Sequence, residues 1–177
     1  MLTHRIATPD DIPAIHALMA RAIATNQQGF LTPAQVALSH NVMGLDTQII
    51  ADGTYFLIER GDTLVGCGGW SARATLYGGD TSIVARDPAP LDPATDAARV
   101  RAMYTDPDCV RQGIGRMILD LCEGAARSAG FGRAEMMATL SGEPLYRACG
   151  YVPIEYVETP PVDGVSVPLI RMGKVLG

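Results

Sequence analysis

Residues Thr105–Arg116, with the sequence TDPDCVRQGIGR, decide the fold of this chain. They follow an extended apolar run, and Gly113 and Gly115 open a strongly periodic helix. Unpaired amides point outward at a helix N-terminus, the helix dipole is positive there, and glycine lets a ligand approach the backbone closely. The stretch therefore predicts a phosphate-binding turn, to which Arg111 and Arg116 add positive charge.

The residues on either side of this turn predict a βαβ unit. Arg99–Tyr104 has the pattern of a central strand, and apolar residues recur from Ile114 to Ala129 at the spacing of one helix face. Gly130 ends that helix, and Ala134–Leu140 predicts the next strand. Because a helix connects the two strands, they should be parallel.

The rest of the chain predicts further strands and helices. Strands are expected at Leu2–Ala7, Thr54–Glu59, Leu64–Trp70, Tyr151–Val157 and Val165–Met172. Arg60-Gly61-Asp62 has the signature of a hairpin turn. Helices are expected from Thr8, where Asp11 completes a capping box, through Ile23, and at Thr32–Gly44 and Glu143–Cys149. Residues 71–97 lack periodicity and predict a long loop, and no linker divides the chain, so residues 1–177 are expected to form a single domain.

Two local features leave alternatives open. His16 lies on the apolar stripe of the first helix, which favours a packed core histidine over a catalytic one. Gly66–Gly69 lies inside a predicted strand beside Trp70, where glycine indicates that something approaches closely. That segment is expected either to line an acceptor pocket, with Trp70 as a wall, or to pack tightly within the sheet.

Composition favours one globular domain. The 177 residues are 47% apolar and 19% charged, which suits a folded core and not a disordered chain. The net charge of -5 argues against nucleic acid or an anionic membrane as a partner. No apolar run approaches membrane-spanning length, and no basic segment with an apolar core begins the sequence, so a cytoplasmic location is expected.

The cysteines and histidines lack the spacing of a metal or disulfide motif. Free thiols are expected at all four cysteines: Cys67, Cys109, Cys122 and Cys149. A functional thiol at Cys67 or Cys149 is the alternative. The histidines have no partners at ligand spacing, so no metal is expected.

Two motifs together resemble those of the GNAT superfamily of N-acetyltransferases. Tyr104–Leu119, with the sequence YTDPDCVRQGIGRMIL, resembles its acetyl-CoA-binding segment. Ala138–Tyr151, with the sequence ATLSGEPLYRACGY, resembles its second hallmark, in which a helix carrying a tyrosine ends in Gly-Phe or Gly-Tyr. The order of predicted elements resembles that fold over the whole chain.

The resemblance implies an α/β (α+β) fold with a mixed, mostly antiparallel sheet of about seven strands and four helices. In that family, the central strand and the strand after the phosphate helix form a parallel pair that splays apart. Acetyl-CoA binds in the opening, where its pantetheine arm lies like an added strand.

The resemblance also implies a cofactor site. The backbone of Met103 and Thr105 would bond pantetheine, an amide near Met103 would polarise the thioester carbonyl, and the amides of Arg111–Arg116 would take the pyrophosphate. The full set is Met103, Tyr104, Thr105, Val110, Arg111, Gln112, Gly113, Ile114, Gly115, Arg116 and Thr139. Val110 departs from the family pattern, which has Gln or Arg there, so one side-chain contact is lost. Thr139 is expected either to touch pantetheine or only to end its strand.

Tyr146 matches the family's general acid, which would protonate the leaving thiolate. A phenol of pKa ~10 is close enough to a thiol for this transfer. The alternative is an ordinary core aromatic. The general base is open: Glu59, Asp80, Asp96 and Glu143 lie on elements flanking the expected cleft, and a water-mediated route is equally consistent with the sequence.

These features predict an enzyme, an N-acetyltransferase that moves an acetyl group from acetyl-CoA to a primary amine of a small molecule. The amine would attack directly in a ternary complex, without a metal. The alternatives are a protein N-terminal or lysine acetyltransferase, a non-catalytic acyl-CoA sensor and a nucleotide-binding module. The family often forms homodimers, and the acceptor is not encoded in any motif.

Overall fold

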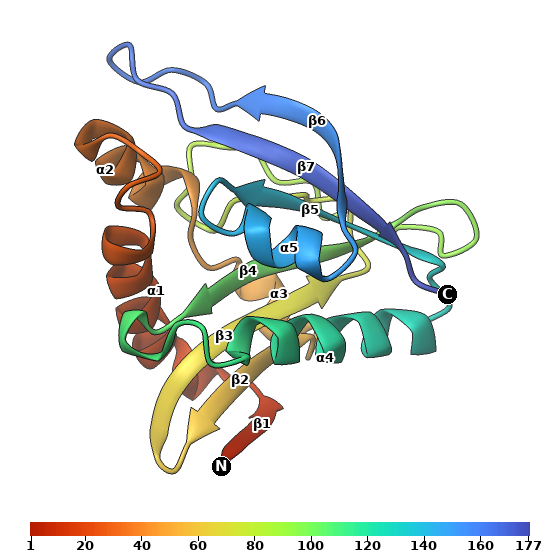
Figure 1. Ribbon diagram of the computed structural model, residues 1–177. Coiled ribbons are helices and arrows are strands. Elements are labelled where there is room, and N and C mark those ends of the chain that lie inside the picture. Colours follow the sequence, from red (N-terminus) through yellow and green to blue (C-terminus); the bar gives the residue numbers. More distant parts are fainter.

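Seven strands form one mixed sheet in the computed structural model, which describes residues 1–177 (Figure 1). The strands are β1 Leu2–Ile6, β2 Tyr55–Arg60, β3 Thr63–Ser71, β4 Ala98–Thr105, β5 Arg133–Thr139, β6 Val152–Glu158 and β7 Pro168–Val175. Their order across the sheet is β1-β2-β3-β4-β5-β7-β6. Only the β4–β5 pair is parallel. The predicted fold class and sheet are confirmed.

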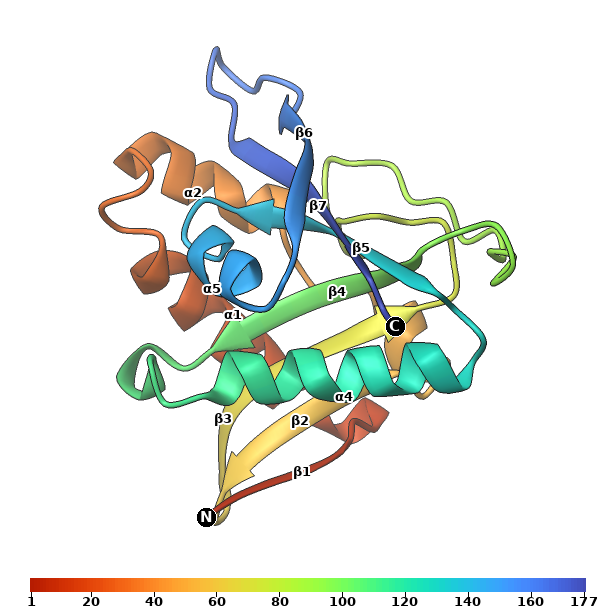
Figure 2. The same ribbon diagram turned by 45° about the vertical axis from the view of Figure 1, so that its right-hand side comes forward.

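Helices cover both faces of the sheet (Figure 2). One face carries α4 and α5, at Ile114–Ser128 and Glu143–Ala148. The other face carries α1, α2 and α3, at Ile12–Asn26, Pro33–Val42 and Thr47–Ala51. None of these helices combines the length and apolar character that a bilayer crossing requires.

The structure has five α-helices, one more than the sequence predicts. The additional helix is α3, which is too short to show an apolar period. Asp46 begins it by accepting a hydrogen bond from the Gln48 amide at 3.0 Å, as an N-cap residue does. Its position under the sheet comes from tertiary packing, since Ile49 and Ile50 are buried in a core with residues of α1 and β2.

The first helix begins as predicted. The Thr8 amide donates to Asp11 Oδ2 at 2.7 Å, which forms the capping box before α1. His16, however, is exposed, so the expectation of a packed core histidine is wrong. The buried stripe of α1 includes Ile15 and Met19. His16 follows Ile15 directly, about 100° further round the helix, and faces solvent.

The last strand begins three residues later than predicted. Val165 belongs instead to a tight turn, in which its amide donates to the Val162 carbonyl at 2.9 Å. Asp163 and Gly164 both have positive φ, at 49° and 78°, as this turn requires. The local apolar pattern continues into the turn, so it did not mark the true start of β7 at Pro168.

The glycines of β3 allow close packing, which decides between the two alternatives for this segment. A Cβ on Gly68 would lie 2.6 Å from Ile118 Cγ2, and one on Gly66 would overlap Ile114. Helix α4 therefore lies directly on β3. Trp70 is buried in the core against Phe131, with ring centroids 6.0 Å apart. It is not an acceptor-pocket wall.

Candidate active site

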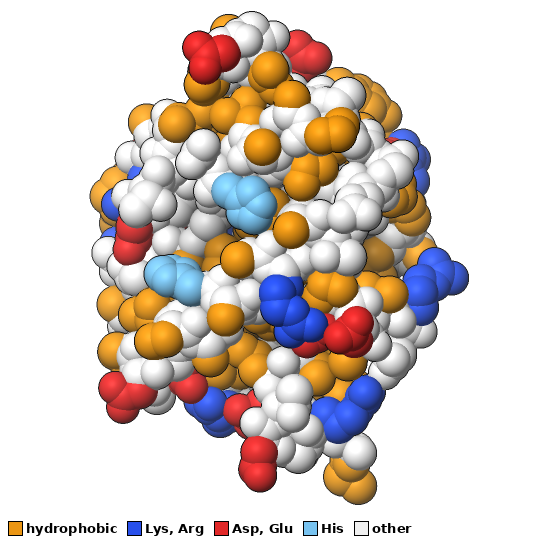
Figure 3. All heavy atoms as spheres, turned by 90° about the vertical axis from the view of Figure 1, so that its left-hand side faces the viewer, with side chains coloured by type: hydrophobic (Ala, Val, Ile, Leu, Met, Phe, Trp, Pro, Cys, Tyr) orange, Lys and Arg blue, Asp and Glu red, His pale blue; other side chains and the backbone are white.

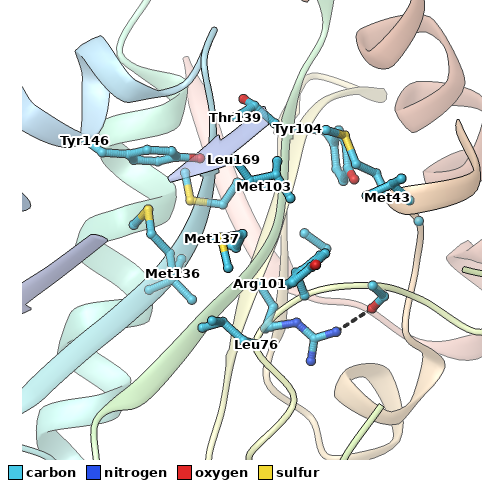
Figure 4. Close-up of a pocket in the computed structure, with 16 residues that line it drawn as sticks. Met43, Leu76, Arg101, Met103, Tyr104, Met136, Met137, Thr139, Tyr146 and Leu169 are labelled. Atoms are coloured by element: carbon cyan, nitrogen blue, oxygen red, sulfur yellow. Dashed lines mark hydrogen bonds between the residues drawn. The ribbon is translucent and has the colours of Figure 1, made fainter. Parts of the chain in front are cut away.

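The parallel strands β4 and β5 separate after two residue pairs. They are in register only at Ala98–Ala134 and Arg99–Glu135, so the rest of each strand faces an opening. The expected splayed parallel pair is therefore present. A cavity lies in the opening (Figure 4), lined by Val42, Met43, Gly44, Leu76, Tyr77, Gly78, Val100, Arg101, Ala102, Met103, Tyr104, Met136, Met137, Thr139, Tyr146 and Leu169.

A bulge in β4 shapes one side of this cavity. The register between β3 and β4 shifts there, and Ala102 has a positive φ of 49°. Tyr55 donates from its hydroxyl to the Ala102 carbonyl at 2.7 Å, which stabilises the bulge. Met103 lies beyond the two β4 residues that pair with β5, so its backbone has no strand partner on the edge that faces the opening. Farther along β4, Asn26 Nδ2 already donates to the Thr105 carbonyl at 2.9 Å.

The loop between β4 and α4 presents backbone amides to solvent. Arg111 and Gly113 have positive φ, at 64° and 84°, and Gly113 is the N-cap of α4. Alternation between left-handed and ordinary conformations turns successive amides toward one point, which favours an anion. Val110, Arg111 and Gln112 are exposed, so Val110 has no packing role that would explain its departure from the family pattern.

Two distant arginines anchor this loop. Arg21 on α1 donates to both carboxylate oxygens of Asp106, at 2.9 and 3.0 Å. Arg60, at the end of β2, donates to Gln112 Oε1 at 2.6 Å. Neither was found in the sequence, because the partners are 85 and 52 residues apart and no local pattern joins them.

Tyr146 lies across the opening from β4. Its hydroxyl points toward the Met103 side chain, and no hydrogen bond joins it to another lining residue (Figure 4). The ring is fixed edge-on against the buried Tyr151, with centroids 6.3 Å apart. Gly142 leaves room for it, since a Cβ there would lie 2.7 Å from Tyr146 Cε2. Burial raises the pKa of Tyr146 to about 12, so the phenol stays protonated at neutral pH.

Helix α5 reaches this position because Gly115 admits it. A Cβ on Gly115 would lie 2.5 Å from Leu145 Cδ2. A Cβ on Gly113, by contrast, would meet nothing within 4 Å. The two glycines of the motif thus have different tasks: Gly113 allows a left-handed N-cap, and Gly115 allows contact between helices.

Thr139 ends β5 and holds the turn into α5. Its hydroxyl accepts a hydrogen bond from the Gly142 amide at 3.1 Å and lies 3.1 Å from Ser141 Oγ. The side chain also lines the cavity. Thr139 therefore acts as a strand-end residue, and its position in the lining also allows contact with a bound cofactor.

None of the candidate bases lines the cavity. Each carboxylate has a partner elsewhere: Glu59 with Arg5 at 3.1 Å, Asp80 with Arg86 at 2.8 Å, Glu143 with Arg147 at 2.7 Å, and Asp96 with the Asp92 amide at 2.8 Å. The only ionised side chain among the lining residues is Arg101. No protein carboxylate is therefore placed to take a proton from a group bound in the opening.

Arg101 is buried and already engaged. Its side chain is 3% exposed, and Nη2 donates to the Gly78 carbonyl at 2.6 Å and lies 3.3 Å from Asp46 Oδ2. Burial lowers the pKa of Arg101, and the Asp46 carboxylate opposes that shift. Arg86 also donates to Asp46, at 2.9 Å. This network holds the 71–97 loop, so that Leu76 reaches the cavity.

Comparison with known proteins decides the family. The model of the acetyltransferase (GNAT) domain matches residues 51–153, which is more than half of the chain. The chain belongs to the GNAT acetyltransferase family. No curated protein matches it at a significant level.

Solved structures share this GNAT fold at low sequence identity. A GCN5-related N-acetyltransferase from Rhodopseudomonas palustris is 17% identical, with a TM-score of 0.70 over 98% of this chain and 94% of its own. The PaiA N-acetyltransferase from Thermoplasma acidophilum, in complex with coenzyme A, is 12% identical, with a TM-score of 0.64 over 99% of each chain. YncA from Salmonella typhimurium, with acetyl-CoA, is 15% identical, with a TM-score of 0.65 over 99% of this chain and 94% of its own.

The thiols of this GNAT chain lie in environments that do not activate them. Burial raises the pKa of Cys67 to about 12, and burial also raises the pKa of the half-buried Cys149. Since the thiolate is the nucleophilic form, neither cysteine is activated at neutral pH. No group of three or more His, Cys, Asp or Glu side chains is arranged to hold a metal ion.

Proposed function

We propose that this protein transfers an acetyl group from acetyl-CoA to the primary amine of a small molecule. One observation carries the proposal: β4 and β5 part beside a turn of exposed amides, and Tyr146 lies across the gap. Coenzyme A and acetyl-CoA are bound in two structural relatives, which supports this choice of donor. We further propose that residues 1–177 act as a single domain.

The donor would lie on the face of the sheet that carries α4 and α5. The amides from Arg111 to Arg116 would bind the pyrophosphate, because a helix N-terminus and a left-handed turn both favour an anion. The pantetheine arm would bond the backbone near Met103 on the edge of β4 that β5 leaves unpaired. Thr139, at the end of β5, would lie beside the thioester end.

The acceptor would approach from the other face, where the end of α2 and the 71–97 loop line the cavity. The surface that carries α1 and α2 shows apolar and neutral groups with charges of both signs (Figure 3). No acidic patch gathers on it, as would suit a lysine-rich protein tail. This favours a small-molecule amine over a protein acceptor.

In the proposed reaction, the neutral amine attacks the thioester carbonyl, a C–N bond forms, and the C–S bond breaks. The backbone amide near Met103 would stabilise charge on the carbonyl oxygen. Tyr146 would donate its hydroxyl proton to the leaving thiolate. The amine would lose its own proton to water, and solvent would return a proton to the Tyr146 phenol. The raised pKa of Tyr146 lies above that of a thiol, so complete proton transfer to the thiolate costs free energy. Tyr146 would therefore act first by donating a strong hydrogen bond to the leaving thiolate.

Incubation with acetyl-CoA and pooled amines, with mass detection of products, tests the proposal. We expect one or more acetylated amines and an equal amount of free CoA. Binding of acetyl-CoA without turnover on any amine or peptide would instead support an acyl-CoA sensor. Acetylation of peptides alone would move the acceptor to the protein class.

A further inference from the structure

The side chains that line the cavity are mainly apolar, and none of them is an anion. These side chains are mainly thioethers and aliphatic groups: Met43, Leu76, Met103, Met136, Met137 and Leu169 (Figure 4). Methionine fills irregular space and adapts to apolar ligands. A bound molecule would therefore meet mainly apolar side chains. The polar side chains in the lining are Arg101, Thr139 and three tyrosines.

The charged groups near the cavity do not offer a site for a second charge. Arg101 is the one cation in the lining, and its guanidinium donates to the Gly78 carbonyl and faces Asp46. Asp46 is 4% exposed and also accepts from Arg86 and the Gln48 amide, so it too is engaged. A carboxylate on the acceptor would find no free cation, and a second ammonium group would find no free anion.

The same surroundings favour the reactive form of an amine. An ammonium ion loses hydration in an apolar cavity, and no carboxylate in the lining replaces that hydration. The other titratable groups that line the cavity are Tyr77, Tyr104 and Tyr146. Burial raises the pKa of all three, and they stay neutral. Desolvation therefore favours the neutral amine, the form that a carboxylate base would otherwise produce by removing a proton.

We propose that the acceptor is a monoamine with an uncharged apolar body, and that diamines, polyamines and amino acids are rejected. This inference rests on the proposed acetyl transfer and names its substrate class. The cavity volume is about 90 Å³, which suits a short chain, so a distal charge only a few carbons from the amine would lie among the lining side chains.

Three compounds with four carbon atoms each test the proposal on the purified full chain. Butylamine, 1,4-diaminobutane and 4-aminobutanoate carry nearly equally basic amines and differ at the distal end, which is a methyl, an ammonium or a carboxylate group. We expect kcat/KM for butylamine to exceed both others at least tenfold. From ethylamine to butylamine, kcat/KM should rise roughly fourfold per methylene, the value of burying one CH₂.

A matched pair of variants tests the physical reason. Met43 lies on the acceptor side, away from Arg101 (Figure 4). Met43→Glu places a carboxylate there and should shift the ratio of kcat/KM toward 1,4-diaminobutane by roughly tenfold. Met43→Gln has nearly the same shape without the charge, and its ratio should stay within threefold of that of the unaltered protein.

The outcomes separate the two proposals. Turnover of 1,4-diaminobutane or 4-aminobutanoate at a rate equal to that of butylamine would overturn the substrate class and leave acetyl transfer intact. An equal shift in Met43→Glu and Met43→Gln would overturn the electrostatic explanation. If no amine is acetylated although acetyl-CoA binds, the proposed function fails, and the substrate class fails with it.

Discussion

At the scale of single residues, the site depends on side chains held by neighbours far from them in sequence. Tyr146 takes its place because Tyr151 supports its ring and Gly142 leaves space for it. The phosphate turn depends on Arg21 and Arg60 in the same way. Substitutions at Tyr146 therefore test chemistry, whereas substitutions at its neighbours test positioning.

Replacement of Tyr146 by Phe should lower kcat by roughly 10²-fold, the usual contribution of one general acid. The hydroxyl makes no hydrogen bond to another lining residue, so its removal should leave the fold and acetyl-CoA affinity unchanged. Single-turnover kinetics and calorimetric titration with acetyl-CoA would measure the two effects. Unchanged chemistry in single-turnover experiments would remove Tyr146 from this role.

The pH dependence of turnover should have an acidic limb and no early alkaline limb. Burial raises the pKa of Tyr146 to about 12, so the acid form persists at every lower pH. On the acidic side, protonation of the acceptor amine removes the nucleophile, and turnover should fall with pH. We expect kcat/KM to rise with pH up to about pH 10, where a primary alkylamine approaches its own pKa. An alkaline decline near pH 8 that disappears in Tyr146→Phe would contradict the raised pKa.

At the scale of elements, the contact between α4 and α5 joins the turn of exposed amides before α4 to the helix that carries Tyr146. Gly115 makes this contact possible, since it lies at the start of α4 and faces Leu145 on α5. The same residue thus belongs to the amide turn and to the packing that fixes Tyr146. A change there should affect both stability and turnover.

Gly115→Ala should destabilise the protein by about 1–3 kcal/mol, because the new methyl group overlaps Leu145 and the core must shift. Turnover should fall as α5 moves. Gly124→Ala is the matched control in the same helix, since a Cβ there meets nothing within 4 Å. It should stabilise the protein by about 0.5–1 kcal/mol through helix propensity. Urea unfolding and steady-state assays would check both; equal stability of the two variants would contradict the packing argument.

At the scale of the whole molecule, the opening between β4 and β5 joins the two faces of the sheet. The α4–α5 face would receive the donor, and the face with α1, α2 and the 71–97 loop would receive the acceptor. A direct transfer needs this arrangement, because both substrates must be bound at once. The sheet therefore separates the two binding regions and brings their reactive ends together.

Acetyl-CoA should stabilise the folded chain in a thermal scan with one cooperative transition. At ~100 times its dissociation constant, a ligand contributes about 2.7 kcal/mol. For a domain of this size, the corresponding rise in Tm is roughly 5–10 °C. ATP and NAD at equal concentrations are the controls. A shift with either of them and none with acetyl-CoA would contradict the proposed donor.

The sequence predicted the parts of the site that are local along the chain. The turn before α4, the strand before it and Tyr146 after it all carry short-range signals: glycines, a change of apolar period and a helix stop. It failed where neighbours in space decide, as for His16, α3 and the start of β7. The sequence also left open the role of Gly66–Gly69. Glycine in a strand indicates that another group packs closely, but it does not identify that group.

The sequence by itself determined the order of elements, the glycine turn before α4 and the family, because these depend on backbone preferences and apolar period within short segments. Only the tertiary structure decided how far β4 and β5 stay paired, which arginines anchor the turn, and that no carboxylate lines the cavity. Those facts depend on contacts between residues far apart in the chain. The physical reason is that side-chain pairing and cavity lining follow from packing, which no local pattern records.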